Sequence, residues 1–273
     1  MTGFSKYLNP VRYLNRASRH VDDYYRTCYR KFIHDAESLE ATENSKFEKN
    51  SLDLAQAQTV LNKILQVMRG RDFDYENDSI HWLVFSALSI STPGIRNILE
   101  IGTFDGEFTS ILSRLFPDAK ITTVDLPASD PLLRDFYDRE EDSAFQRYKK
   151  KQAANLANEN IKLIETNSFF LLEKTSEKFD LIWVDGGHLY PEVAWDLCSA
   201  YHLCASGGHV LCDDVIPLKK LYRDRYVSTE SFEVLNYLEA RASVQLALFL
   251  KRRNPLFFAK IKQRKYVACL KKP

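Results

Sequence analysis

The sequence is poor in several features that mark particular classes of protein. Its five cysteines are scattered along 273 residues without a Cys-x-x-Cys pair, which argues against a disulfide framework or a zinc site. No apolar run approaches the roughly 18 residues that a membrane span needs, and the first residues lack the apolar segment of a signal peptide. We therefore expect a cytoplasmic protein. A formal net charge of only +1 argues against general nucleic-acid binding.

The composition that remains is that of a globular protein. With 45% hydrophobic and 27% charged residues, the chain suits one large domain, or one domain with an appendage. Basic residues gather at both ends, and residues 251–273 contain no acid at all. Both ends are therefore candidates for contact with an anionic neighbour.

Residues 97–125 read as strand, glycine turn, helix and strand. Ile98, Leu99 and Ile101 form the short apolar run that is typical of a buried parallel strand. Gly102 and Gly106 follow, and they allow a tight turn that approaches a ligand closely. The N-terminal amides of the next helix would then face whatever lies over the turn.

This acid-x-Gly-x-x-x-Gly pattern, with a second acid ending the next strand, resembles the cofactor motif of Rossmann-like S-adenosylmethionine-dependent methyltransferases. The resemblance implies that the methionine part of the cofactor is surrounded by Glu100, Gly102, Thr103, Phe104, Asp105 and Gly106. It also implies that Asp125 holds the ribose hydroxyls and that Leu126 lies against the adenine. A dinucleotide site is the weaker interpretation, because its Gly-x-Gly-x-x-Gly pattern would need glycine at the position of Phe104.

Strands and helices continue to alternate as far as residue 214, with further strands expected at 161–165, 179–184 and 208–212. This order predicts a parallel sheet with helices on both faces and a ligand site at the carboxyl ends of its strands. The fold class implied by the resemblance is α/β, a Rossmann-like, doubly wound and mostly parallel sheet of seven strands. Thr166, Asn167 and Ser168 suit a helix cap, and the family also places an adenine contact there.

We expect an N-terminal helical extension over residues 1–75 and the methyltransferase domain over 76–273. Residues 4–33 have the spacing of amphipathic helices, for which three roles stay open: packing on the domain or a second subunit, a substrate lid, or attachment to an anionic membrane surface. Polar residues 36–51 read as a mobile connection. Residues 130–158 read as a long charged helical segment that either covers a substrate pocket or forms a solvated crossover.

The carboxyl ends of the fourth and fifth strands carry the chemically informative residues. Asp185 and His188 follow the fourth strand, and Asp213 and Asp214 follow the fifth. Acids brought together without compensation repel one another, so a cation would resolve the repulsion. Oxygen ligands without cysteine favour magnesium over zinc. In a purely structural interpretation the same acids cap neighbouring backbone, and His188 is a loop residue without a chemical role.

Here the resemblance narrows to metal-dependent O-methyltransferases of the catechol and macrocin O-methyltransferase type. It implies a divalent metal on Asp185, Asp213 and Asp214, with Asp185 beside the cofactor. In the catechol enzyme a lysine three residues after the first ligand is the general base, and here that position is His188. The histidine departs from the pattern, but an imidazole can accept a hydroxyl proton near neutral pH.

The sequence therefore predicts a magnesium-dependent O-methyltransferase that acts on a hydroxyl of a small molecule, such as a sugar or another vicinal diol. S-adenosylmethionine and Mg²⁺ are the expected cofactors, and a homo-oligomer is an open possibility. One alternative is a metal-independent enzyme with His188 as its base. Another is a catalytically silent scaffold of the same fold that joins a membrane-associated assembly.

Overall fold

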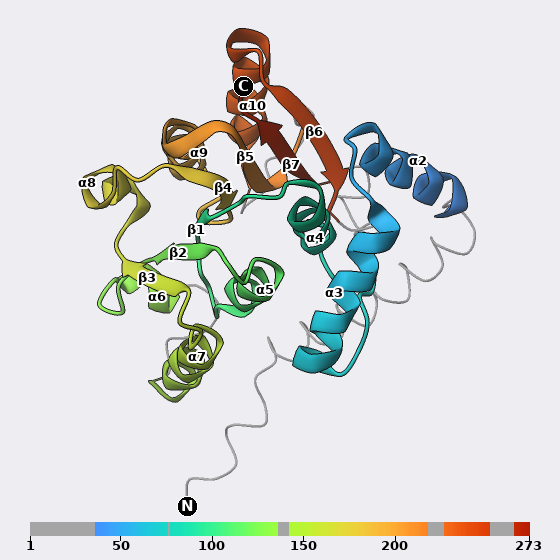
Figure 1. The fold of residues 1–273 in the computed structure, drawn as a ribbon. Coiled ribbons are helices and arrows are strands. Elements are labelled where there is room, and N and C mark those ends of the chain that lie inside the picture. The colour runs from blue at the N-terminus through green and yellow to red at the C-terminus, as the bar shows by residue number, and fades with distance from the viewer. Residues whose placement is uncertain (1–35, 76, 136–141, 218–226, 252–264) are drawn as a thin grey trace, which may run out of the picture.

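The computed structural model describes residues 36–75, 77–135, 142–217, 227–251 and 265–273 (Figure 1). The amphipathic segment expected over residues 4–33 lies outside these ranges. So do residues 252–264 of the basic C-terminal stretch.

The core of the structure is one seven-stranded sheet in the order β3-β2-β1-β4-β5-β7-β6. Strands β1 to β5 run parallel, and β7 is inserted antiparallel between β5 and β6. The strands are β1 Asn97–Ile101, β2 Lys120–Asp125, β3 Ile161–Glu165, β4 Phe179–Val184, β5 Cys204–Val215, β6 Gln245–Leu250 and β7 Tyr266–Lys271. The predicted fold class, a doubly wound and mostly parallel sheet, is confirmed.

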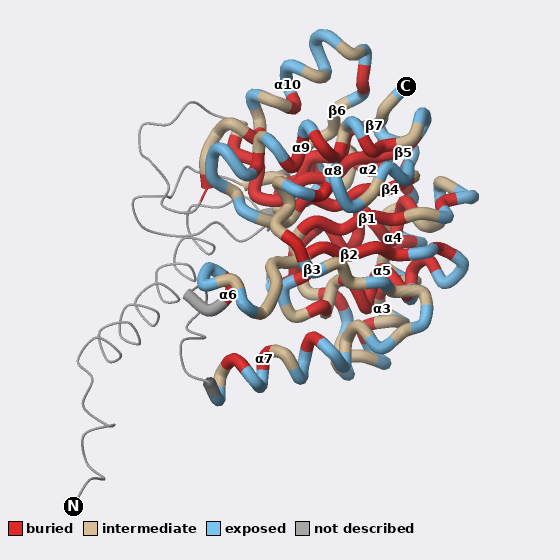
Figure 2. The backbone as a smooth tube through the Cα atoms, turned by 90° about the vertical axis from the view of Figure 1, so that its left-hand side faces the viewer, coloured by how far each residue is buried: buried red, intermediate tan, exposed pale blue. Residues whose placement is uncertain are grey.

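Helices cover both faces of the sheet (Figure 1). One face packs against α3 Leu54–Arg69, α4 His81–Ser91 and α5 Glu107–Leu115. The other packs against α8 Leu171–Lys174, α9 Glu192–Leu203 and α10 Glu230–Ala242. Successive strand residues point to opposite faces, so Ile98 belongs to the first core cluster and Leu99 to the second. The inner strands are accordingly buried along most of their length (Figure 2), whereas the edge strands β3 and β6 are more exposed.

Helix α3 begins and ends where its sequence predicts. The Asp53 side chain caps its N-terminus by accepting a hydrogen bond from the Gln56 amide at 2.9 Å. Gly70 ends the helix in the left-handed conformation, with φ of 66°. Between these two signals a stripe of buried residues at four-residue spacing, Ala57, Leu61 and Leu65, faces the core.

Residues 36–51 are not a mobile connection, so that expectation was wrong. Ala36–Lys49 form helix α2, which lies beside edge strand β6 (Figure 1). Phe47 is only 1% exposed, and its ring lies 4.9 Å from that of Phe249, centroid to centroid. One aromatic side chain thus anchors a helix whose remaining residues are mostly polar.

Two of those polar residues bind the open edge of the sheet. Glu43 accepts a hydrogen bond from the Leu250 amide at 3.0 Å, and Lys46 donates one to the Leu248 carbonyl at 3.0 Å. Backbone groups on an edge strand have no neighbouring strand to pair with, and α2 supplies partners for two of them. The polarity that suggested a loop is therefore part of the packing.

Two other elements differ in extent from the sequence expectation. The segment 130–158 contains two helices, α6 Pro131–Asp135 and α7 Asp142–Asn155, and residues 136–141 between them lie outside the described ranges. Strand β5 begins at Cys204, earlier than the expected start at residue 208.

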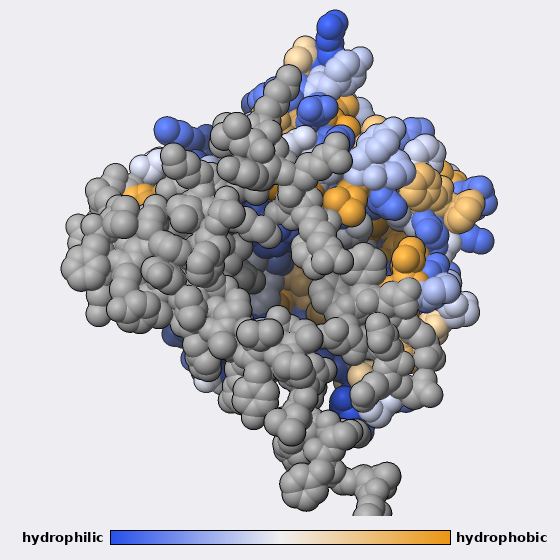
Figure 3. Space-filling model, turned by 180° about the vertical axis from the view of Figure 1, so that it is seen from behind, coloured by the Kyte–Doolittle hydropathy of each residue, from blue (hydrophilic) through white to orange (hydrophobic). Residues whose placement is uncertain are grey.

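Residues on both sides of the expected division at 75/76 contribute to one core. Leu61 and Leu65 belong to the same hydrophobic cluster as Leu83 in α4 and Trp183 in β4. The division into residues 1–75 and 76–273 remains a prediction. The described surface in Figure 3 is mostly hydrophilic, with hydrophobic residues in small separate patches. Within the described ranges, no helix combines the length and apolar character needed to cross a bilayer.

The packing of α2 can be tested with Phe47→Ala. Because the side chain is buried against Phe249, we expect the free energy of unfolding in denaturant to fall by about 3 to 5 kcal/mol. Val67 of α3 is 82% exposed and serves as the control, with an expected change of less than about 0.5 kcal/mol for Val67→Ala. Equal effects of the two substitutions would show that α2 does not pack on the sheet.

Candidate functional site

The turn after β1 is in direct backbone contact with the end of β4. Gly102 has φ of 98°, and a Cβ atom there would collide with the backbone carbonyl of Asp185. The Asp185 amide in turn donates a hydrogen bond to the Ile101 carbonyl at 2.8 Å. Only glycine fits this position, and its close approach brings the predicted cofactor turn to Asp185.

The glycine turn is held from the other side by α7. Tyr148 and Gln152 donate hydrogen bonds to the Phe104 carbonyl at 2.9 and 2.7 Å. Asn155 donates one to the Asp105 carbonyl at 2.8 Å. Phe104 itself has a positive φ of 51°, which is uncommon for a residue other than glycine. Helix α7, expected to cover a pocket or to be solvated, thus holds the predicted cofactor turn in shape.

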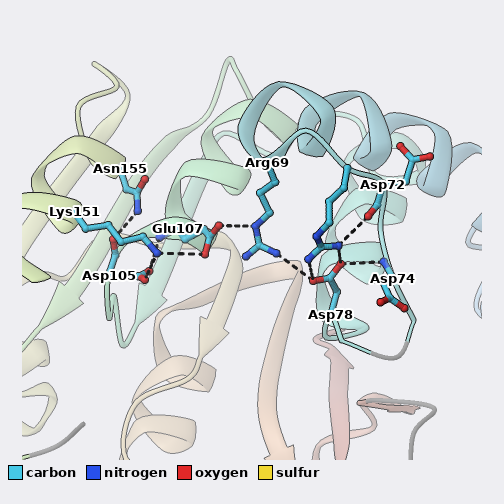
Figure 4. A network of polar contacts seen from close by, with 9 residues as sticks. Arg69, Asp72, Asp74, Asp78, Asp105, Glu107, Lys151 and Asn155 are labelled. Atoms are coloured by element: carbon cyan, nitrogen blue, oxygen red, sulfur yellow. Dashed lines mark hydrogen bonds and ion pairs between the residues drawn. The ribbon is translucent and has the colours of Figure 1, made fainter. Parts of the chain in front are cut away.

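A chain of ion pairs extends from this turn to the N-terminal helices (Figure 4). Lys151 of α7 contacts Asp105 at 2.8 Å. Arg69, the last residue of α3, contacts Glu107 of α5 at 2.6 Å and Asp78 at 3.1 Å. The residues flanking the second glycine of the turn are therefore tied both to α7 and to the helix that precedes the sheet.

Glu100, predicted to lie under the methionine part of the cofactor, is buried in a pocket of hydroxyl groups. One of its carboxylate oxygens accepts hydrogen bonds from Thr109 at 2.5 Å and Thr123 at 2.6 Å. Thr123 also bonds to Thr103, at 2.6 Å. Burial raises the pKa of Glu100 to about 8, against the opposing effect of the two threonine hydrogen bonds.

The residues predicted for the nucleoside lie at the ends of β2 and β3, at the same edge of the sheet. Asp125 accepts a hydrogen bond from the Leu126 amide at 2.8 Å through its side chain, and one from the Thr166 amide at 2.8 Å through its carbonyl. Asn167 caps the short helix Ser168–Phe170 by accepting from the Phe169 amide at 3.0 Å. The structure thus shows the capping role of Asn167.

Asp185 and His188 form a pair at the mouth of the site. His188 Nε2 lies 3.3 Å from Asp185 Oδ1, and both side chains are partly exposed. Burial raises the pKa of Asp185 to about 6, and the negative charge of Asp213 acts in the same direction. Burial disfavours the charged imidazole of His188, but its hydrogen bond to Asp185, together with the negative charges of Asp185, Asp214 and Asp213, outweighs burial and raises its pKa.

Two lysines neutralise the negative charges of Asp213 and Asp214. The ammonium of Lys251 contacts a carboxylate oxygen of Asp213 and lies 2.7 Å from one of Asp214. Lys265 contacts the other oxygen of Asp214 at 2.5 Å. Burial alone would raise the pKa of Asp213, but the charge of Lys251 holds it below its usual range.

Neighbouring strand residues normally point to opposite faces, yet both of these acids reach one ammonium. The β5–β7 register shifts between Cys212 and Val215, and Asp214 has a positive φ of 54°. This irregularity turns the Asp214 side chain toward Lys251, which stands at the end of β6. Lys251 and Lys265 face each other across the β6–β7 pair, with the Lys251 amide donating to the Lys265 carbonyl at 3.0 Å.

A divalent cation fits three of the predicted residues. Asp185, His188 and Asp213 each offer a ligand atom, and these atoms lie within 4.8 Å of one another. Asp213 Oδ1 is buried without a hydrogen-bond partner among the described residues, so it has an unused lone pair. Asp214 is outside this group, and both of its oxygens bond to lysines. Its assignment as a ligand remains a prediction.

Several residues of the site escaped the sequence prediction. Lys251 and Lys265 counted only as members of the basic C-terminal stretch, and no local pattern links them to acids far away in the sequence. Tyr148 and Gln152 lie in the segment expected to cover a pocket or to be a solvated crossover, and neither was predicted to contact the cofactor turn. His81 was also overlooked; it stacks on Trp183 at 4.7 Å, and its charge contributes to lowering the pKa of Asp213.

Comparison with known families decides the class of the domain. Residues 99–215, from β1 to the end of β5, match a family described as a methyltransferase domain. The match covers less than half of the chain, and together with the order of the strands it supports an S-adenosylmethionine-dependent methyltransferase. The methyltransferase match includes every residue predicted to bind the cofactor or a metal. No curated protein sequence matches the chain.

Solved structures similar to the methyltransferase span several activities. One is the O-methyltransferase TomG from Streptomyces achromogenes in complex with S-adenosylmethionine, at 18% identity, covering 93% of this chain and 96% of that one, with a TM-score of 0.44. A candidate caffeoyl-CoA O-methyltransferase from Staphylococcus aureus has 17% identity, 92% and 99% coverage and a TM-score of 0.46. An rRNA methylase from Streptococcus thermophilus has 12% identity, 70% and 95% coverage and a TM-score of 0.46. None of these likenesses identifies an acceptor.

The close approach at Gly102 predicts a large effect of Gly102→Ala on cofactor binding. Gly94 is a matched control, because its φ of 102° is also positive but a Cβ there meets no atom within 4 Å. Both alanines strain the backbone, and only the first also pushes the turn away from β4. We expect Gly102→Ala to weaken S-adenosylhomocysteine binding at least about tenfold relative to Gly94→Ala in calorimetry. Equal affinities would contradict the close contact.

The buried Glu100 predicts a pH-dependent difference in stability. Its carboxyl has a pKa of about 8 in the folded chain, whereas the pKa of an unperturbed glutamate is 4.5. Its contribution to stability is therefore complete below pH 4.5 and is lost as the pH rises toward 8. Glu100→Gln has no such titration, so its melting temperature should improve relative to the unmodified chain as the pH rises from about 5 to 8. A constant difference over that range would contradict the raised pKa.

Proposed function

We propose that this methyltransferase transfers a methyl group from S-adenosylmethionine to a hydroxyl oxygen of a small-molecule acceptor. The observation that carries the proposal is the Asp185–His188 pair, 3.3 Å apart, on the strand end that packs against Gly102 of the cofactor turn. Such a pair supplies a base beside the methyl donor, which a hydroxyl nucleophile needs because it is weak while protonated.

In this mechanism His188 accepts the proton of the acceptor hydroxyl. Its Nε2 is bonded to Asp185, so Nδ1 is the ring nitrogen left to act as base. The acceptor oxygen attacks the methyl carbon in line with the carbon–sulfur bond, and the electron pair of that bond passes to sulfur. The products are a methyl ether and S-adenosylhomocysteine, with the proton on His188. Asp185 stabilises the imidazolium that forms.

The proposed acceptors are sugars or other molecules with neighbouring hydroxyl groups. Support comes from two carboxylates near the base: Asp185 is partly exposed, and the buried Asp213 has one oxygen without a hydrogen-bond partner among the described residues. A carboxylate accepts hydrogen bonds from hydroxyl groups, and two carboxylates can orient two adjacent hydroxyls.

We also propose a magnesium-dependent form of the mechanism. Its metal ligands differ from the three acids that the sequence predicted. Asp185, His188 and Asp213 would hold the cation, because their ligand atoms converge. When bound, a divalent cation would lower the pKa of the acceptor hydroxyl and fix its direction. His188 would then be a ligand, and a different group would take the proton.

The metal-independent form, in which His188 is the base described above, is favoured by a specific observation. Lys251 and Lys265 already neutralise Asp213 and Asp214. The repulsion between uncompensated acids, which was the reason to expect a cation, is therefore relieved within the chain.

The role of His188 can be tested by measuring methyl transfer to a panel of sugars and catechols from labelled S-adenosylmethionine. We expect His188→Ala to lower kcat by about 10² to 10⁴, because the acceptor loses its base. The control is His202→Ala, which replaces an exposed histidine of α9 and should leave kcat unchanged.

Repeating the assay in chelator separates the two mechanisms. Activity that survives chelator but is lost in His188→Ala supports the histidine base, and activity lost in chelator supports the magnesium site. Full activity of His188→Ala in chelator would refute both assignments. Absence of transfer to any hydroxyl acceptor, with S-adenosylhomocysteine bound, would count against O-methylation.

A further inference from the structure

The ammonium of Lys251 occupies a central position among the acids of the site. Its side chain is 20% exposed and contacts both Asp213 and Asp214. The backbone of Lys251 is also fixed. Its carbonyl accepts a hydrogen bond at 2.9 Å from the amide of Ile80, the residue before α4. Lys251 is thus a fixed part of the site.

Charge compensation of the three acids is nearly complete without a metal. Asp185, Asp213 and Asp214 carry three negative charges when ionised, and Lys251 and Lys265 carry two positive ones. The remaining charge lies near His188, whose imidazole bonds to Asp185. A divalent cation would give this cluster an excess of positive charge, and it would have to bind Asp213 beside an ammonium.

We infer that Lys251 is an internal cation that competes with a divalent metal for Asp213. The unmodified chain therefore binds such a metal weakly, and removal of the ammonium converts the site into a tighter one. The inference rests on the proposed function, and it favours the metal-independent form of the mechanism.

The two lysines differ in a way that makes the inference specific. Lys251 bonds to Asp213, which offers a ligand atom to the possible metal group. Lys265 bonds only to Asp214, which does not belong to that group. Loss of Lys251 frees an oxygen of Asp213 and leaves a buried carboxylate in need of a cation. Loss of Lys265 leaves Asp213 paired as before.

The test is a titration of the full chain, saturated with S-adenosylhomocysteine, with Mn²⁺ alone. Calorimetry and the electron paramagnetic resonance signal of free Mn²⁺ report binding without any assay of activity. Lys251→Met removes the charge at nearly the same side-chain length, and Lys265→Met is the matched control. Lys251→Arg keeps the charge, and Lys251→Met with Asp213→Asn removes the proposed ligand as well.

We expect weak Mn²⁺ binding by the unmodified chain and at least about tenfold tighter binding by Lys251→Met. Lys265→Met and Lys251→Arg should resemble the unmodified chain, and the double variant should lose the gain. Binding by Lys251→Met no tighter than that of the unmodified chain would overturn the inference. So would an equal gain in Lys265→Met.

Two measurements keep the test decisive if Lys251→Met does not fold. Lys251→Gln then replaces it as the neutral variant, purified with Mn²⁺ present. The unmodified chain is informative by itself, because micromolar Mn²⁺ affinity that is lost in Asp213→Asn would overturn the inference. S-adenosylhomocysteine affinity is recorded for each variant. A chain that fails to bind it speaks against the proposed function, whereas altered metal affinity in a chain that binds it concerns Lys251 alone.

Discussion

The structure of the site depends on a backbone contact that leaves no room for a side chain. Gly102 lies against the carbonyl of Asp185, so the turn after β1 and the end of β4 are too close together for a side chain at this position. The cofactor turn and the acid–imidazole pair belong to different strands, and this contact makes them one site. The hydrogen bonds from α7 to the Phe104 and Asp105 carbonyls then fix the outer side of the same turn.

Buried carboxyl groups around this contact are accommodated in three different ways. Glu100 retains a proton, with a pKa of about 8. Asp78 stays ionised because Arg71 donates two hydrogen bonds to it, each of 2.7 Å. Asp213 stays ionised beside Lys251. Asp185 differs from all three, since it is partly exposed and its pKa is about 6. It is the carboxyl of this set whose charge responds most readily to a bound molecule near neutral pH.

The sequence predicted those parts of the structure that depend on neighbouring residues. The glycine turn and the strand-end acids are local signals, and each was found at its expected position. Contacts between distant segments left no such signal. Helix α2 was read as a loop because its polar residues, Glu43 and Lys46, bind the backbone of a strand some 200 residues later. Likewise, the need for a cation was inferred from the acids alone, because nothing in the sequence pairs Lys251 with Asp213.

Helix α2 also bears on how this chain behaves when it is shortened. A fragment that begins at the expected domain boundary keeps all seven strands but lacks α3, which packs in the core, and α2, which covers β6. Its edge strand would then present free backbone groups next to the exposed ring of Phe249, which is the arrangement that allows sheets of different molecules to join. In the full chain, residues 36–49 cover the edge strand at which such joining would occur.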